Sequence, residues 1–487
     1  MRSIEILVVL AAVFASPRMS LCASIGNREK NICEGVLPGQ LLNEIDSYAP
    51  IVERIINATA RAGSEFAGST WTELSTFVDK FGSRFTGTKN LEDSIDYVLN
   101  RSATVGLENV HGEAATVPRW IRGHESAALL TPRTKDLKIL GLGYSVGTGE
   151  QGITAEAIVV SSFDELRARK SQVRGKIVVY NEKFVSYGET VAYRSSGAVE
   201  AAKLGAVATL IKSITPFSLY TPHTGMMHYE ANVTKIPAAC ITHEDASLLS
   251  RLAARGERIS LKIFMEAKTL PDVQSRNIVS EIVGKTEPAK VVVVSGHVDS
   301  WDVGQGAMDD GGGAFVSWGS LVLLKRLNLR ARRTIRSIMW TGEEMGIIGA
   351  TRYIKEHLAE RSNLQFVMES DMGTFAPLGL MYDGTLTVRC VLEKVMRLLE
   401  PLGTTQLKSP SEGPDIGAWT EAGVPSASLW TQNDKYFWYH HSEADTMEVE
   451  DPVALDRSTA LFAAVAYILA DTSLDLPHGQ TYTTNII

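Results

Sequence analysis

The feature that most constrains the fold is an alternation of short apolar runs and helical patterns in the second half of the chain. Short apolar runs at 291–294, 334–339 and 365–368 are typical of buried strands, and 311–326 and 346–359 have the pattern of helices between them. Such an alternation predicts an α/β fold with a sheet flanked by helices. In sheets of this kind, functional residues gather at the carboxyl ends of the strands.

Side chains able to bind a metal ion follow each of these apolar runs. In chain order they are His297 and Asp299, Asp309 before the glycines 311–313, Glu343 and Glu344, Asp371, and far downstream His440, His441 and Asp445. Each motif alone is a weak signal, because Asp-Asp-Gly is usually a turn and Glu-Glu is usually a solvated helix start. Their order after successive strands predicts that they converge at one edge of the sheet.

The residue types indicate the chemistry of this edge. Histidine and carboxylate ligands without cysteine suit zinc in a hydrolytic site. Two zinc ions about 3.5–4 Å apart need a bridging carboxylate and several anionic ligands. A further carboxylate must take the proton from the attacking water, and the Glu343–Glu344 pair offers one side chain for each task. The spacing therefore predicts metal-assisted hydrolysis.

The ordered motifs resemble the zinc-dependent exopeptidase family of the double-zinc aminopeptidases and glutamate carboxypeptidase. The matching motifs are His297-x-Asp299, Gly306-x-x-Asp309, Glu343-Glu344, Asp371-Met372 and His441-x-x-x-Asp445. The resemblance covers nearly the whole mature chain. It implies a mixed, largely parallel central sheet with an inserted β-rich, protease-associated-like domain. It also implies a homodimer that hydrolyses short peptides, in particular unblocked dipeptides.

The resemblance implies two zinc ions per chain and a ligand set for each. Asp309 would bridge the two ions, His297 and Asp371 would complete one site, and Glu344 and His441 would complete the other. Asp310 in place of Asp309, and His440 in place of His441, are alternatives that the family spacing disfavours.

The resemblance also implies catalytic roles. Glu343 would be the general base, and Asp299 would hold the His297 ring by accepting its other N–H; Asp445 could do the same for His441. Several relatives have a tyrosine where this chain has His440. A protonated or N–H-donating His440 could stabilise the oxyanion in its place.

The carboxylates of the stretch 411–415 allow two interpretations. Glu412 and Asp415 could hold a substrate's free amino terminus, or the stretch could be a loop with a helix cap at Asp415.

The beginning of the chain is typical of a secretory signal. Arg2 precedes an apolar run at 6–15, which is too short to span a bilayer, and cleavage is expected near Ala23 or Ser24. The expected division is a signal peptide at 1–24, a possible propeptide at 25–38, a catalytic domain at 39–124 and 269–476, and a C-terminal tail at 477–487. Residues 125–268 are the inserted domain, called the inserted module below. No later segment is expected to cross a membrane, and the protein is expected to be secreted or lysosomal.

Two further features bear on a secreted chain. Sequons at Asn57, Asn100 and Asn232 are candidate glycosylation sites. Loss of Cys22 with the signal leaves an odd number of cysteines, Cys33, Cys240 and Cys390. At most one disulfide can then form within the chain, and burial as ordinary small apolar residues is favoured over it.

Composition and motifs weigh against other functions. The formal net charge is −8, which argues against nucleic acid as the main partner. A non-catalytic binding protein on the same fold and a one-zinc acyltransferase similar to glutaminyl cyclase are disfavoured by the complete ligand set. A serine hydrolase is also disfavoured by that ligand set. Gly143-Tyr144-Ser145-Val146-Gly147 fits Gly-x-Ser-x-Gly, but a match to this motif alone is a weak signal.

Overall fold

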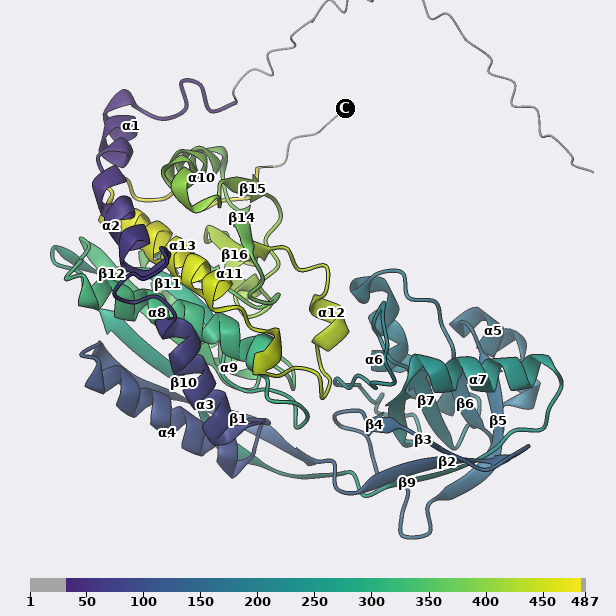
Figure 1. The fold of residues 1–487 in the computed structure, drawn as a ribbon. Helices are drawn as coiled ribbons and strands as arrows, with labels where there is room; N and C mark the ends of the chain where they lie inside the picture. The colour runs from purple at the N-terminus through teal and green to yellow at the C-terminus, as the bar shows by residue number, and fades with distance from the viewer. Residues whose placement is uncertain (1–31, 483–487) are drawn as a thin grey trace, which may run out of the picture.

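The structure is a computed structural model that describes residues 32–482, in which two eight-stranded sheets are joined by a long ribbon (Figure 1). The predicted signal peptide, the first half of the possible propeptide and the end of the tail lie outside the described residues.

The elements have the following bounds. The helices are α1 (Gly39–Asp46), α2 (Ala49–Thr59), α3 (Ser69–Phe81), α4 (Lys89–Thr104), α5 (Phe163–Ala168), α6 (Tyr187–Lys203), α7 (His243–Ala254), α8 (Gly312–Arg326), α9 (Ile348–His357), α10 (Leu386–Leu398), α11 (Gly417–Glu421), α12 (Tyr436–Tyr439) and α13 (Pro452–Asp471). The strands are β1 (Glu108–Ile121), β2 (Glu125–Thr131), β3 (Lys135–Leu137), β4 (Ile139–Gly141), β5 (Ile153–Val160), β6 (Ile177–Tyr180), β7 (Ala208–Lys212), β8 (Ala238–Ile241), β9 (Ser260–Met265), β10 (Lys268–Ile282), β11 (Glu287–His297), β12 (Arg333–Trp340), β13 (Leu364–Glu369), β14 (Pro377–Asp383), β15 (Gln406–Lys408) and β16 (Ser426–Thr431).

The central sheet has the strand order β1-β10-β12-β11-β13-β16-β14-β15. Strand β11 is parallel to both β12 and β13, with Val294 opposite Ser337 on one side and Met368 on the other. Strand β13 is parallel to β16, whereas β10 pairs antiparallel with β1 and β12. The predicted α/β fold with a mixed central sheet is therefore confirmed, and the carboxyl ends of β11, β12 and β13 share one edge.

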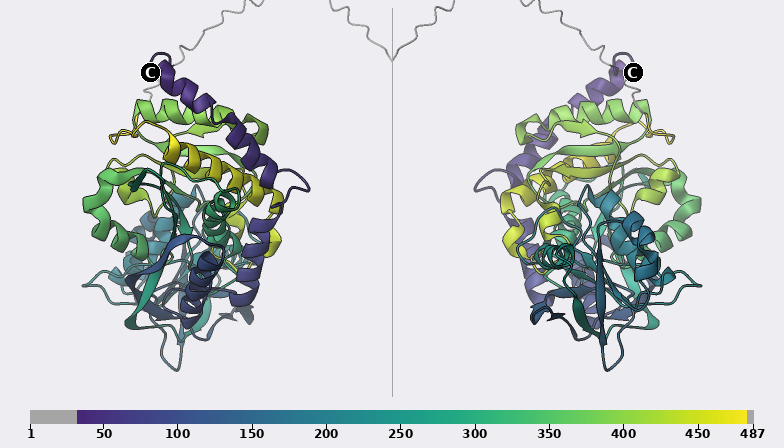
Figure 2. Two further views of the ribbon diagram at one scale, coloured as in Figure 1. Left: turned by 90° about the vertical axis from the view of Figure 1, so that its left-hand side faces the viewer. Right: turned by 90° about the vertical axis from the view of Figure 1, so that its right-hand side faces the viewer.

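Helix α13 packs against the central sheet and its neighbouring helices. It is buried along most of its length and contacts α8, α2 and α3, and Figure 2 shows it in yellow among the purple N-terminal helices. Among residues 32–482 it is also the one helix long and apolar enough to cross a membrane. This does not contradict the expectation that no segment after the signal crosses a membrane, because length and composition alone do not show a membrane span and most of the apolar window of α13 is buried inside the fold. The apolarity of α13 is explained by its burial on all sides.

Two features of the helices follow from local sequence. Helices α1 and α2 are separate, and Pro50 lies in the first turn of α2. Proline has no N–H for a helical hydrogen bond, so it suits a helix start and not a helix interior. Helix α6 is 17 residues long and begins after Ser186, whose side chain accepts a hydrogen bond from the Glu189 N–H.

The second sheet has the order β3-β2-β9-β5-β6-β7-β8-β4, and all of its strands lie between Glu125 and Met265, within the inserted module. The chain enters along β1 and returns along β10. These two long strands form an antiparallel ribbon that pairs Glu108 with Glu281 at one end and Ile121 with Lys268 at the other. In Figure 1 the inserted module is placed with α6 facing α12 of the catalytic domain.

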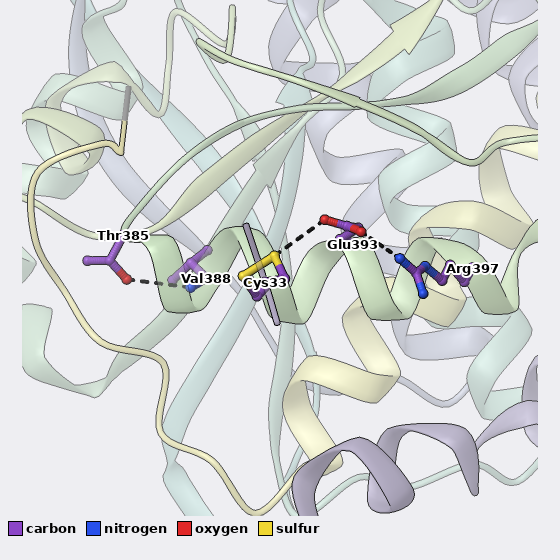
Figure 3. The surroundings of a disulfide bond; sticks show 6 residues. Cys33, Thr385, Val388, Glu393 and Arg397 are labelled. Carbon is purple, nitrogen blue, oxygen red and sulfur yellow. Dashed lines mark hydrogen bonds and ion pairs between the residues drawn. A yellow bond between two sulfur atoms is a disulfide. The ribbon is translucent and has the colours of Figure 1, made fainter. Parts of the chain in front are cut away.

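A disulfide joins Cys33 to Cys390, which lies in α10 (Figure 3). The favoured interpretation of Cys33 and Cys390 as ordinary apolar residues was therefore wrong. The sequence did not show the pairing, because the two cysteines are 357 residues apart. Cys240 is buried and free, and burial raises the pKa of its thiol to about 12. The bond anchors the part of the possible propeptide that the structure describes.

We expect the disulfide to stabilise the fold measurably. Replacing both Cys33 and Cys390 by serine should lower the free energy of unfolding by about 2–4 kcal/mol, because the bond restricts the unfolded chain. Thermal unfolding with and without a reductant measures this. The reductant should lower the Tm of the wild type and leave the double variant unchanged. Equal responses of the two proteins would contradict the expectation.

Candidate metal centre

The candidate site residues come together at the edge that the parallel strands share. His297 ends β11, Glu343 and Glu344 follow β12, and Asp371 follows β13. Asp309 precedes α8, and His440 and His441 follow the short helix α12. Five loops and strand ends that are far apart in the sequence therefore supply one site.

The first group of side chains surrounds the Nε2 atom of His297. This atom lies 3.3 Å from Asp309 Oδ1, 3.4 Å from Asp371 Oδ1 and 4.0 Å from Glu343 Oε2. His297, Asp309 and Asp371 offer ligand atoms close enough to hold one ion. The second carboxylate oxygen of Asp309 faces the other group.

The second group surrounds the Nε2 atom of His441. This atom lies 3.3 Å from Asp309 Oδ2 and 3.0 Å from Glu344 Oε2. His440 stacks on His441 with ring centroids 3.5 Å apart, and its own Nε2 is 3.7 Å from Asp309 Oδ2. Asp309, His440 and His441 thus form a second cluster able to hold an ion. We favour Glu344 and His441 over His440 as its ligands, because their contacts are shorter.

The pKa values of several ionisable groups in this site are strongly shifted. Burial raises the pKa of Glu343 and of Glu344 well above the usual value for glutamate, and neighbouring carboxylates raise both further. Burial also lowers the pKa of His441 well below its usual value and that of His440 to about 3. Both histidines are therefore neutral, as a metal ligand requires, and a protonated His440 is disfavoured.

The donor set fits a pair of divalent cations. Three buried atoms of the site, His297 Nε2, Asp309 Oδ2 and Glu344 Oε1, have no hydrogen-bond partner among the described residues. Buried polar atoms are normally satisfied, and a group of buried carboxylates is costly without a counter-charge. Imidazole nitrogens and carboxylate oxygens without thiolates are the ligands of hydrolytic zinc sites.

Asp310 points away from both groups. Its Oδ2 accepts a hydrogen bond of 2.9 Å from the His297 N–H, so it fastens the loop to β11. The glycines that follow permit this close packing, since a Cβ atom at Gly313 would lie 1.9 Å from the carbonyl oxygen of Ser370. The alternative in which Asp310 bridges the ions has no geometric support.

Asp299 supports both His297 and Glu343. Its carbonyl oxygen lies 3.0 Å from His297 Nδ1, whereas its carboxylate Oδ1 is 3.6 Å from that atom. The carboxylate accepts hydrogen bonds from Thr86 Oγ1 and from the Glu343 N–H. The ring is thus held mainly by the backbone of Asp299, and the carboxylate positions the turn that carries Glu343.

Asp445 does not contact the His441 ring as the resemblance suggested. Its carboxylate accepts hydrogen bonds from the N–H groups of Met308 and Asp309. The Nδ1 atom of His441 instead lies 3.2 Å from the carbonyl oxygen of Thr224, in the inserted module. Asp445 therefore supports Asp309, the candidate bridging residue, and Thr224 contacts the His441 ring.

Arg84 is a buried support that the sequence did not reveal. It donates hydrogen bonds to the carbonyl oxygens of Val298, Gln305 and Gly306, and so holds the loop between His297 and Asp309. No motif marks Arg84, since three of the four carbonyl oxygens to which its guanidinium donates are more than 200 residues away.

A cavity of about 330 Å³ opens onto the metal-competent groups and includes residues of the inserted module. Arg194 of α6 lies in its wall with a side chain that is 6% exposed. The guanidinium donates to Tyr187 Oη and to the Thr224 carbonyl. Among residues 32–482 it pairs with no carboxylate, and its Nε has no hydrogen-bond partner. The cavity therefore contains an unpaired buried cation.

The stretch 411–415 contributes one carboxylate to the cavity. Glu412 is exposed and lies in the cavity wall. Asp415 is buried behind the site beside Glu369, whose carboxylate accepts the Asp415 N–H. Glu412, and not Asp415, is therefore placed to meet a substrate.

The three sequon asparagines have exposed side chains. Asn57 lies in α2, Asn100 lies in α4, and Asn232 lies in the loop between β7 and β8. Exposure is what a glycan requires, and their occupancy stays a prediction.

Comparisons with known proteins agree with this site. The model of "Peptidase family M28" matches residues 277–466, a range that includes every candidate metal ligand. Carboxypeptidase Q of Xenopus laevis is 52% identical over 434 residues, which cover 89% of this chain and 92% of the relative. The human carboxypeptidase Q is 48% identical over 465 residues, covering 95% and 97%.

The chain belongs to peptidase family M28. A solved structure, a peptidase M28 precursor from Shewanella amazonensis, superposes with a TM-score of 0.85 at 30% identity and covers 90% of this chain and 100% of its own. This M28 chain is therefore a peptide-bond hydrolase of the metallo-exopeptidase class.

Proposed function

We propose that this M28 chain binds two zinc ions and hydrolyses short peptides, with unblocked dipeptides as its preferred substrates. The observation that supports this most is the position of Asp309, whose two carboxylate oxygens face separate ligand groups at 3.3 Å. A single carboxylate between two such groups is the arrangement that a two-metal hydrolase requires.

The proposed mechanism assigns a task to each side chain. Bound zinc would polarise the scissile carbonyl and lower the pKa of the attacking water. Glu343 accepts the proton of that water and delivers it to the leaving amine. Its backbone is fixed by Asp299, so the carboxylate is held beside His297. The Nε2 atom of neutral His440 lies 3.7 Å from Asp309 Oδ2, and an N–H of this ring could donate to the developing oxyanion.

Two charged groups of the cavity suit the free ends of a dipeptide. Arg194 has unused hydrogen-bonding capacity and no counter-ion, and guanidinium groups bind carboxylates in a planar, paired geometry. We assign it to the substrate's terminal carboxylate. Glu412, at the exposed part of the wall, is assigned to the free amino group. A cavity with an anchor for each end favours short substrates.

A panel of dipeptides tests this substrate class. We expect the zinc-loaded protein to cleave an unblocked dipeptide much faster than the same dipeptide with a carboxamide end. In Arg194→Met this preference should shrink by about 10- to 150-fold in kcat/KM, which corresponds to the loss of a charged hydrogen bond of about 1.5–3 kcal/mol.

The matched control is Arg255→Met, an exposed arginine of the inserted module that should keep the wild-type preference. An Arg194→Met variant with that preference would contradict the assignment of Arg194. A zinc-loaded wild type that cleaves no dipeptide would contradict the proposed substrate class.

The remaining proposals concern the localisation, glycosylation and oligomeric state of the protein. The disulfide between Cys33 and Cys390 supports passage through the oxidising secretory pathway, since such bonds are rare in the cytosol. We propose a secreted or lysosomal, glycosylated protein that forms a homodimer. Glycosidase treatment and light scattering of the secreted protein test the glycans and the oligomeric state.

A further inference from the structure

The segment that carries His440 and His441 is hydrogen-bonded to the inserted module. The Nδ1 atom of His223 lies 2.6 Å from the carbonyl oxygen of His440. The Thr224 N–H donates to the carbonyl oxygen of His441 at 2.9 Å, and the Thr224 carbonyl lies 3.2 Å from the Nδ1 atom of His441. Two consecutive residues of the module thus contact two consecutive residues of the metal centre.

Aromatic and hydroxyl contacts extend this connection. Tyr187 of the module stacks on Phe437 with ring centroids 4.6 Å apart. Phe217 stacks on Trp438 at 4.1 Å. The Thr215 hydroxyl donates to the Phe437 carbonyl at 2.5 Å. The position of the His440–His441 segment therefore depends on a surface that lies more than 200 residues earlier in the chain.

His223 is suited to hold this segment. The residue is 2% exposed, and its backbone N–H donates to Ser213 Oγ. The ring faces a carbonyl oxygen, which can only accept, so Nδ1 carries the proton and donates to His440. Within residues 32–482 this is the one hydrogen bond of the ring, since its Nε2 has no partner there, so the ring is placed to hold the His440 carbonyl.

We propose that His223 is a positioning residue of the metal centre, which fixes His441 for binding one of the two zinc ions; this inference rests on the proposed function. The orientation of a metal-binding histidine is set by the hydrogen bond of its other ring nitrogen. For His441 the acceptor is the Thr224 carbonyl, directly after His223. The inserted module therefore completes the metal centre that the catalytic sheet begins.

The proposal predicts an unequal effect on the two ions. The ring of His297 is oriented by the carbonyl oxygen of Asp299, which belongs to the catalytic domain. Loss of the His223 contact should lower the affinity for the ion held by Glu344 and His441. The ion held by His297 and Asp371 should keep its affinity.

The test measures zinc affinity in the full chain. His223→Leu removes the donor but keeps a buried side chain, whereas His223→Asn keeps an N–H donor near the position of Nδ1. Titration of the metal-free proteins against a competing chelator should show one zinc bound about 10- to 100-fold more weakly in His223→Leu and the other unchanged. His223→Asn should retain two sites of nearly wild-type affinity.

Two further variants keep the test decisive. His478→Leu is the matched control, because it removes another histidine-to-carbonyl contact, to Leu364 at the amino end of β13, away from both His223 and the His440–His441 segment. If His223→Leu does not fold, as seen by circular dichroism, His223→Gln replaces it, since its longer side chain moves the donor away from the His440 carbonyl. It should then bind one zinc more weakly than His223→Asn does.

The outcomes separate the two proposals. Two zinc sites of wild-type affinity in the folded Leu and Gln variants, or an equal weakening of both sites, would overturn the positioning role of His223. A wild-type chain that binds no pair of zinc ions would contradict the proposed function itself.

Discussion

Replacing Glu343 by glutamine should lower kcat by about 10²–10⁴-fold on an unblocked dipeptide, while the protein keeps its full zinc content. Glutamine has the shape of glutamate but cannot accept a proton, so the attacking water loses its base. The turn that carries residue 343 is held through its backbone N–H by Asp299, and this contact survives the substitution. Steady-state kinetics together with metal analysis measure the effect.

The matched control for this substitution is Glu360→Gln, which makes the same change at an exposed position on the surface. It should keep wild-type turnover. A Glu343→Gln variant that retains wild-type kcat would remove Glu343 from the role of general base. A variant that loses zinc would show instead that Glu343 acts as a ligand.

Replacing Asp309 by asparagine should abolish detectable turnover and reduce the bound zinc below two ions per chain. The neutral amide keeps the size of the side chain but offers one carbonyl oxygen where the carboxylate offers an oxygen to each ligand group. Zinc at about 1,000 times its Kd stabilises a protein by about 4 kcal/mol per site. Added zinc should therefore raise the Tm of the wild type more than that of Asp309→Asn.

The control for Asp309 is Asp272→Asn, an exposed aspartate of β10 that should leave the zinc response unchanged. An Asp309→Asn protein with two tightly bound zinc ions and an undiminished rise in Tm would contradict the bridging role.

The fold and the contents of the candidate site could be predicted because both depend on local patterns. The apolar runs of β11, β12 and β13 indicated buried parallel strands. Parallel strands place their carboxyl ends at one edge. His297, Glu344 and Asp371 follow these ends directly in the sequence, so their convergence was predictable without knowledge of any distance.

The supports of the site could not be predicted, because they depend on contacts between distant segments. Thr224 is 217 residues from His441. It contributes a backbone carbonyl, which every residue type has, so its identity in the sequence gives no signal. Arg194 lies on a helix of the inserted module. It reaches the cavity because of the position that the β1–β10 ribbon gives the module relative to the central sheet. The pairing of Cys33 with Cys390 is hidden for the same reason.

The central claim is that two zinc ions lie on either side of Asp309. Anomalous diffraction from crystals of the zinc-loaded protein, recorded above and below the zinc absorption edge, tests it most directly. We predict two peaks about 3.5–4 Å apart, one beside His297 and Asp371 and the other beside Glu344 and His441. A single peak, or a pair of peaks that does not flank the Asp309 carboxylate, would contradict the account.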